Sequence, residues 1–338
     1  MRSWSSHPLF GFAVVVFAAS LFGTLGPLSR FAYEAGMEPL PFVAWRGLIG
    51  ALGTAAFVFW RIRRGGERLI RIGELAPSVR VTLGIAALTG FTLNLAMFIA
   101  FDRISVALAL LGFYTYPAMV AVVAVALGRE RLDRAKKLAL ALATLGMVAV
   151  VASQLDPAGG IRVDAIGFGL ALGAAVSQAV FVTISRDGYR AVPTDQAMTV
   201  ILVTTVVSCA ILAVATGTGA ALLFPLESPD VLPLILFTGL FAAALPSLAV
   251  LTGIRLIGGM RSGILMLFEP VVGVALAAWL LAEGIEPIQV VGGAAILSAA
   301  VILQRSAPAD AEATTTAPLD RPARIEEESL RVRVPGGP

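Results

Sequence analysis

The chain contains the stretch YPAMVAVVAVALGRE at residues 116–130 and a stretch of the same character, EPVVGVALAAWLLAE, at residues 269–283. In both stretches a proline precedes a glutamate by 13 residues, and both residue types recur after a shift of 153 residues. The residues between the proline and the glutamate of each stretch are largely apolar. A pattern that returns at one spacing indicates that the chain is built as two related halves.

The composition is typical of a membrane protein. Hydrophobic residues make up 58% and charged residues 14% of the 338 residues, whereas soluble domains average about 45–50% and 25%. A helix that spans a bilayer needs about 20 apolar residues, so ten helices with short loops account for most of the chain. The apolar runs are continuous, which favours helices over the alternating pattern of a β-barrel.

Stretches with little or no charge mark ten expected transmembrane helices. They are Leu9–Ser29, Leu40–Trp60, Val81–Phe101, Ile104–Gly128, Leu138–Leu155, Ala165–Ser185, Ala197–Thr216, Val231–Ile254, Ser262–Ala282 and Pro287–Gln304. Five fall in each half, and an odd number makes the two halves enter the membrane from opposite sides. We therefore expect an all-α integral membrane protein whose ten helices form two five-helix repeats of inverted topology.

The same boundaries divide the chain into five parts. We expect a short cytoplasmic N-terminus at residues 1–8, repeat 1 at 9–155, an external linker at 156–164, repeat 2 at 165–304 and a cytoplasmic tail at 305–338. The tail is rich in Pro, Ala, Thr and Glu and cannot bury a core, so it is predicted to be disordered.

Loop charge predicts the orientation. With the N-terminus inside, the external loops hold Arg30, Arg103 and Arg162. The cytoplasmic loops then hold Arg61, Arg63, Arg64, Arg68, Arg71, Arg80, Arg129, Arg131, Arg134, Lys136, Lys137, Arg186, Arg190, Arg255 and Arg261. Positive residues concentrate in cytoplasmic loops, so both termini are predicted to face the cytoplasm from a bacterial-type inner membrane. The net charge of +3 then reflects orientation rather than a nucleic-acid partner.

The inventory of reactive residues excludes several kinds of chemistry. The one histidine, His7, precedes the first apolar stretch, and the one cysteine, Cys209, lies within another. Histidine-based metal sites and catalytic triads inside the membrane are therefore excluded. The sequence also lacks the glycine-rich loop with lysine that cradles the phosphates of ATP. We expect no cofactor, no metal and no catalytic residue, and a driving force from a gradient of ions, protons or substrate.

Two charged residues lie within the apolar stretches. Glu269 is near the middle of its stretch, where an ionisable group is by default a functional hypothesis; it either handles a substrate cation or a coupling proton, or is structural. Its counterpart in the repeat is Tyr116. Arg46 lies nearer the external end, where it either extends outward to the interface or holds an anionic group or another helix.

Uncharged polar residues offer further candidates. Asn94, Tyr114 and Gln178 lie near the middle of their stretches, where each either hydrogen-bonds a substrate or bridges two helices. Gly169 and Gly173 form a pattern of small residues that predicts close helix packing.

The repeated prolines are expected to kink their helices. Pro117 and Pro270 each remove a backbone donor and leave the carbonyl four residues earlier poorly bonded, at Phe113 and Met266. In a membrane such a carbonyl needs a partner or a cavity. The kinks therefore either line a central pathway or are packing bends.

These features together resemble the EamA-like branch of the drug/metabolite transporter superfamily, in which two five-helix units form a ten-helix carrier. The resemblance covers about residues 10–304 and rests on Arg46, on Tyr116-Pro117 followed by Gly128-Arg129-Glu130-Arg131-Leu132, and on Glu269-Pro270 followed by Ala282-Glu283-Gly284-Ile285. The second copy has Gly284-Ile285 where the first has Arg131-Leu132, which weakens the case for a shared role of this loop.

The resemblance implies a secondary transporter that exports a small metabolite, such as an amino acid or a related compound, by alternating access, with proton coupling as one option. The direction rests on the resemblance alone. The alternative is a membrane-embedded enzyme or a flippase of lipid-linked substrates, but an enzyme would need paired carboxylates, a metal cluster or a nucleophile with a base. We expect a small-molecule substrate and the lipid bilayer as partners, no nucleic acid and no enzymatic activity; the sequence indicates no oligomeric state.

Overall fold

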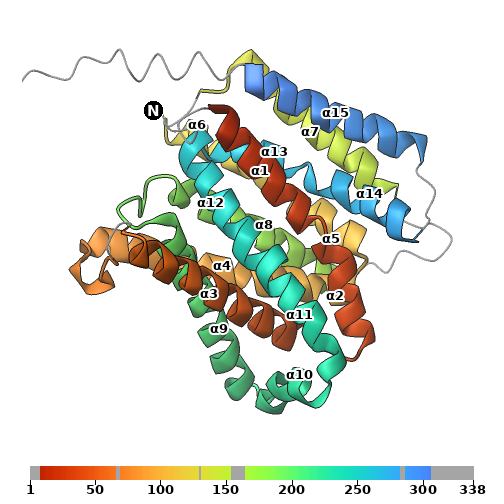
Figure 1. Ribbon diagram of the computed structural model, residues 1–338. Helices are drawn as coiled ribbons and strands as arrows, with labels where there is room; N and C mark the ends of the chain where they lie inside the picture. Colours follow the sequence, from red (N-terminus) through yellow and green to blue (C-terminus); the bar gives the residue numbers. More distant parts are fainter. Residues whose placement is uncertain (1–7, 66–68, 129–130, 154–163, 282–285, 306–338) are drawn as a thin grey trace, which may run out of the picture.

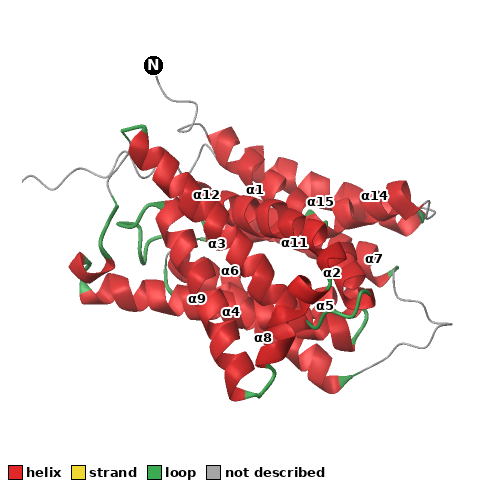
Figure 2. Cartoon of the chain, turned by 60° about the horizontal axis from the view of Figure 1, so that its bottom comes forward, coloured by secondary structure: helices red, strands yellow, loops and turns green. Residues whose placement is uncertain are grey.

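The chain folds into a bundle of helices joined by short loops, and no strand is drawn in the part that is described (Figures 1 and 2). The computed structural model describes residues 8–65, 69–128, 131–153, 164–281 and 286–305. Within them, eight helical segments are long and apolar enough to cross a membrane, and the shorter apolar helix Pro287–Leu303 follows. The expected all-helical membrane fold is confirmed. The N-terminus, the external linker and the tail, predicted at 1–8, 156–164 and 305–338, lie almost wholly outside the described residues.

The helices fall into two sets along the chain. The first half contains α1 (Pro8–Phe22), α2 (Leu25–Glu34), α3 (Pro39–Arg63), the short helix η2 (Ile72–Glu74), α4 (Pro77–Arg103), α5 (Val106–Phe113), α6 (Tyr116–Ala126) and α7 (Arg134–Ala152). The second half contains α8 (Ala165–Ser185), α9 (Thr194–Ala215), η3 (Gly219–Leu223), α10 (Phe224–Glu227), η4 (Pro229–Val231), α11 (Leu232–Gly239), the π-helical turn η5 (Leu240–Ala244), α12 (Leu245–Ile257), α13 (Gly259–Met266), α14 (Glu269–Leu281) and α15 (Pro287–Arg305).

The fourth and ninth predicted spans are each broken into two helices at the same place. α5 and α13 have eight residues each, and α6 and α14 begin three residues after they end. Pro117 and Pro270 are the second residues of α6 and α14, a position at which a proline costs a helix no hydrogen bond. The structure thus places a helix start at each repeated proline. Glu130 and Glu283, the glutamates of the same motif, lie outside the described residues.

Helix packing follows the symmetry of the repeat. α7 packs along α15 and α3 along α9, which pairs equivalent helices of the two halves (Figure 1). α1 packs on α12, and its equivalent α8 packs on α4, the equivalent of α12. The same holds for α8 with α5 and α6, and for α1 with α13 and α14. Exchanging the halves therefore reproduces the contacts, as expected for an inverted repeat.

The closest approach of equivalent helices lies between α7 and α15. A Cβ atom added to Gly146 would lie 2.5 Å from the carbonyl oxygen of Gly292, and one added to Gly292 would lie 2.6 Å from that of Gly146. The predicted close packing at Gly169 and Gly173 is wrong, because a Cβ atom at either position meets nothing within 4 Å. These two glycines face outward from α8, and the tight contact belongs to a pair that the sequence pattern did not single out.

Two ion pairs mark opposite ends of the bundle. Arg61, near the end of α3, donates from Nε to Oδ2 of Asp195 in the first turn of α9 at 2.6 Å. Arg103, at the end of α4, donates to Asp164, which precedes α8. The first pair joins segments that the charge pattern assigns to the cytoplasmic side, and the second joins segments assigned to the external side.

Candidate functional site

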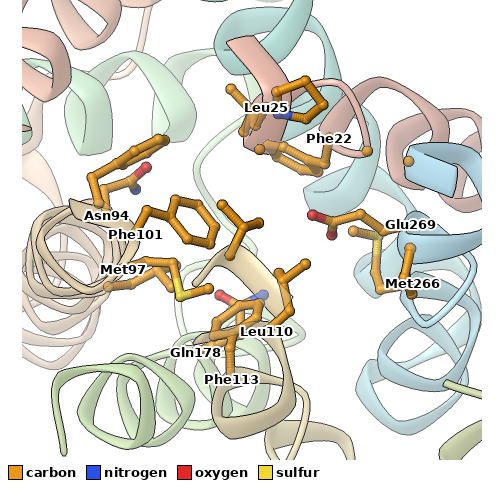
Figure 3. A pocket seen from close by; sticks show the side chains of 18 of the residues that line it. Phe22, Leu25, Asn94, Met97, Phe101, Leu110, Phe113, Gln178, Met266 and Glu269 are labelled. Carbon is orange, nitrogen blue, oxygen red and sulfur yellow. The ribbon is translucent and has the colours of Figure 1, made fainter. Parts of the chain in front are cut away.

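A cavity of about 750 Å³ lies inside the bundle and is lined by both halves of the chain (Figure 3). Cavities that hold small molecules in proteins usually measure about 300–1,000 Å³. Its lining comes from most of the membrane helices, including α1, α3, α4, α6, α8, α9, α12 and α14. A single small metabolite would fit within it.

Many of the residues that line the cavity occupy equivalent positions in the two halves of the chain. Six pairs are separated by the shift of 153 residues that relates the two proline motifs. They are Leu25 and Gln178, Gly90 and Ala243, Asn94 and Ser247, Met97 and Val250, Phe113 and Met266, and Tyr116 and Glu269. The cavity is therefore centred where the two halves meet.

Arg46 forms one wall of the cavity from α3. Its Nη1 donates to the carbonyl oxygen of Ala242 at 2.9 Å, and its Nη2 donates to Oδ1 of Asn94. The guanidinium lies 4.8 Å from the centre of the Phe98 ring, and the residue is only 5% exposed. Arg46 therefore joins α3, α4 and η5 and does not extend outward to the interface.

The Ala242 carbonyl, which accepts from Arg46, lacks its usual α-helical donor because of a proline. Pro246 in α12 has no N–H group to donate to the carbonyl four residues earlier, which is that of Ala242. The backbone is also locally widened into the π-helical turn Leu240–Ala244, a feature that often marks functional sites. Pro246 was not among the predicted kink sites, although a proline within the eighth apolar stretch carries the same signal as the repeated prolines.

Glu269 forms another part of the wall, across the pocket from Asn94 in the view of Figure 3, with its carboxylate directed into the cavity. It is the first residue of α14, where the free N–H groups of a helix favour a negative side chain. No lysine or arginine among the described residues forms an ion pair with it. The acid thus faces the cavity rather than a cation of the protein.

Two tyrosines accompany Glu269. Tyr116 and Tyr114 are each 1% exposed, and both lie within electrostatic range of the Glu269 carboxyl. Tyr116 lines the cavity, whereas Tyr114 does not and is part of the core. The Tyr114 hydroxyl lies near the Glu269 carboxyl and makes no hydrogen bond to any other described residue. The structure thus places Tyr114 beside the site without placing it in the cavity wall.

The rest of the wall is largely apolar. Gln178, 8% exposed, is one polar exception, and its Oε1 has no hydrogen-bond partner among the described residues. The wall also contains aromatic rings and thioethers that were not predicted, because nothing in an apolar run distinguishes a residue facing a cavity from one facing lipid. They are Phe22, Met97, Phe98, Phe101, Phe113, Phe181, Met198 and Met266.

The cavity has a mouth at one end of the bundle. Its lining reaches Arg30 and Glu34 of α2, Ser105 before α5, Ser153 after α7 and Glu286 before α15. All five lie at or near helix ends that the charge pattern assigns to the external side. We call these five residues the mouth.

The sequence matches one known family in both halves. The sequence model of the EamA-like transporter family matches residues 9–152 and again residues 165–305. The chain belongs to the EamA-like transporter family. As the resemblance implied, it is a multi-pass membrane protein of the drug/metabolite transporter superfamily. Each half is one EamA unit, so the cavity of this EamA-like chain lies between two units of one family.

Comparison of structures supports the same fold. A solved structure titled "Crystal structure of protein" superposes with a TM-score of 0.66 at 20% sequence identity, covering 89% of this chain and 96% of that chain. No curated protein matches the chain.

The EamA-like chain gathers five of its six polar candidates in one cavity. Arg46, Asn94, Tyr116, Gln178 and Glu269 line it, together with Pro270. Pro117 and Tyr114 do not. Within the described residues no group of three or more His, Cys, Asp and Glu side chains could hold a metal ion.

Proposed function

We propose that this EamA-like protein is a secondary transporter that exports a small metabolite by alternating access. The observation that carries the proposal is the cavity lined by six pairs of equivalent residues, one from each half. Two inverted halves that share a central cavity can exchange their conformations and so open it first to one side and then to the other. The direction of export rests on the family and not on a residue.

The chemistry of the wall supports a substrate with two opposite charges on an apolar body, such as an amino acid or a related compound. Arg46 offers a positive charge, and its Nε has no hydrogen-bond partner among the described residues, which suits an anionic group. Glu269 offers a carboxylate for a cationic group, and the rings and thioethers between them suit an apolar body.

Transport by the purified protein tests the proposal directly. A metabolite screen in proteoliposomes, run with and without a proton gradient, should identify substrates that carry both an amino and a carboxyl group. Lactate-like acids and simple amines of the same size are the matched controls, and they should be transported at least about tenfold more slowly, because each leaves one buried charge unpaired. Flux of none of these compounds, or equal flux of all three, would contradict it.

We also propose that Glu269 carries the coupling proton when transport is coupled. The support is its position in the cavity, without a cation of the protein as partner. Glu269→Gln should then remove the dependence of flux on pH, while Tyr116→Phe, the matched change in the other half, should retain it. Flux of the Glu269→Gln variant that still follows pH would overturn the coupling role and leave the transport role standing.

We propose separately that the protein lies in an inner membrane with both of its termini in the cytoplasm. The support is that Arg61 and Asp195 bring two predicted cytoplasmic segments together in the fold. A reporter fused after Gly65, in the loop between α3 and α4, should be active in the cytoplasm, and activity of the fusion outside the cell would reverse the assignment.

A further inference from the structure

A hydrogen-bonded cluster closes the end of the bundle opposite the mouth. Arg255, in the last turn of α12, donates from Nη1 to the carbonyl oxygen of Val192 at 2.9 Å and to Oγ1 of Thr194 at 3.0 Å. Its Nη2 donates to the carbonyl oxygen of Tyr189 at 3.3 Å, and its guanidinium lies 5.3 Å from the centre of the Tyr189 ring. One side chain therefore ties α12 to the loop between α8 and α9.

The loop that Arg255 holds is packed into the core. Tyr189 is fully buried, and its hydroxyl lies 2.5 Å from Oγ of Ser185 at the end of α8. We call six buried residues at this end of the bundle the plug; all belong to one apolar cluster, and they are Val182, Tyr189, Val192, Ile254, Ile257 and Met260. None of the six lines the cavity. The plug thus lies outside the cavity wall, at the ends of α8, α12 and α13 that loop charge assigns to the cytoplasmic side.

The equivalent position at the other end of the bundle is different. A shift of 153 residues takes Arg255 to Asp102, in the last turn of α4 beside the mouth. Asp102 forms no hydrogen bond or ion pair with the described residues. The cavity lining reaches the helix ends on the side without the tie and not those on the side with it, although the backbones of the two ends are related by the repeat.

We propose that Arg255 is a gating residue, which holds the plug closed while the mouth is open and must release the loop when the cavity opens to the other side. This inference rests on the proposed function, because a gate has meaning only if the cavity opens to both sides. Arg255 touches neither the cavity nor the substrate; it acts by positioning the loop between α8 and α9.

The geometry sets the size of the expected effect. A hydrogen bond from a charged group stabilises a contact more than a neutral hydrogen bond does. Arg255 donates three such bonds, two of them to the backbone carbonyls of Val192 and Tyr189 and one to Thr194. Loss of the guanidinium should favour the conformation open at the plug by about tenfold or more. Lysine keeps the charge but cannot reach three acceptors at once, so Arg255→Lys should give an intermediate shift.

Two-sided labelling of one cavity position tests the gate. Ser247 lines the cavity, and the nearly isosteric substitution S247C places a thiol there for labelling. The substitution C209A removes the buried native thiol, so that only the introduced one can react. A membrane-impermeant maleimide is applied to right-side-out and to inside-out membrane vesicles containing the full chain. The matched control is Arg190→Ala, in the same loop, where the arginine side chain is 64% exposed and its ion pair with Asp187 spans 3.5 Å.

The two sides of the membrane give distinct outcomes. With Arg255 intact, the S247C thiol should react mainly from the side of the mouth. In Arg255→Ala its labelling from the opposite side should rise about tenfold while labelling from the mouth falls, with Arg255→Lys between, and the control unchanged. Labelling in Arg255→Ala and Arg255→Lys that matches the control would overturn the gate and leave the transporter intact. A thiol that never reacts from the plug side, even with transported substrate present, would instead contradict alternating access itself.

Discussion

The two halves of the chain share a backbone plan and differ in chemistry. Both break their fourth span at a proline, and both supply six equivalent positions to the cavity. At three of these positions the side chains differ in kind, since Tyr116 corresponds to Glu269, Asn94 to Ser247 and Leu25 to Gln178. Two halves with equivalent backbones can exchange their conformations, as alternating access requires. An asymmetric substrate, in contrast, needs different chemical groups from each half.

The largest difference between the halves concerns Arg46, whose counterpart after the shift is Thr199. Arg46→Ala should lower the free energy of unfolding by about 3 kcal/mol, since it leaves the Ala242 carbonyl and the Asn94 amide without their partner. Thr199→Ala should cost about 1 kcal/mol, because it removes only hydrogen bonds to Thr54 and to the Asp195 carbonyl. Unfolding by SDS in mixed micelles measures both, and equal losses would contradict the assignment.

The contact between equivalent helices can be tested at its glycines. Gly146→Ala should destabilise the protein by about 2 kcal/mol, because the added methyl group meets the backbone of Gly292. Gly169→Ala, which meets nothing within 4 Å, should be neutral or stabilising by up to about 1 kcal/mol through helix propensity. The thermal midpoint in detergent should separate the two variants. The reverse order would restore the packing role first predicted for Gly169.

Asn94 and Ser247 are a matched pair within the cavity. Asn94→Ala removes the acceptor that holds Arg46 Nη2 and should weaken substrate binding by about tenfold, because the guanidinium is then no longer held in place for an anionic group. Ser247→Ala should change binding little, because Ser247 forms no hydrogen bond with the described residues. Substrate-dependent quenching of tryptophan fluorescence is one readout, and a larger effect at Ser247 would show that the second half holds the anionic group.

The smallest effect is expected at the exposed ion pair by the mouth. The hydrogen bond from Arg103 lowers the pKa of the Asp164 carboxyl below its ordinary value of 3.8. A lowered pKa in the folded state adds stability that is present above pH 3.8 and is lost as the pH falls through the lowered pKa. Asp164→Asn should therefore lower the thermal midpoint slightly at pH 7, and the difference from the native chain should vanish in acid. A difference that grows in acid would contradict this sign.

Most of the fold was predictable from the sequence, because the cost of charge and of unpaired backbone in lipid leaves few alternatives to apolar helices. The shift of 153 residues revealed the repeat through one proline and one glutamate, and five of the six helix boundaries from α5 to α7 recur at that shift from α13 to α15. The eighth span was harder, because the π-helical turn before Pro246 depends on a partner, Arg46, that lies about 200 residues away along the chain.

The candidate site was predictable only for its charged and polar members. Glu269, Arg46 and Asn94 stood out because polar groups in lipid are costly, and the structure places all three in one cavity. Arg255 did not stand out, since an arginine at the cytoplasmic end of a span is what the loop-charge rule predicts anyway. Its hydrogen bonds depend on how α8, α9 and α12 meet, and no local pattern encodes that meeting.

The mutual contact of Gly146 and Gly292 has a consequence for how the protein is made. Contacts between equivalent elements of two related units are those of a twofold dimer, in which each unit presents the same surface to the other. Two separate five-helix chains would need to be inserted in opposite orientations, in equal amounts, before α7 could meet α15. A single chain enforces both conditions at once, because the orientation of its first helix dictates that of every later one, and the linked partner is always present at high effective concentration.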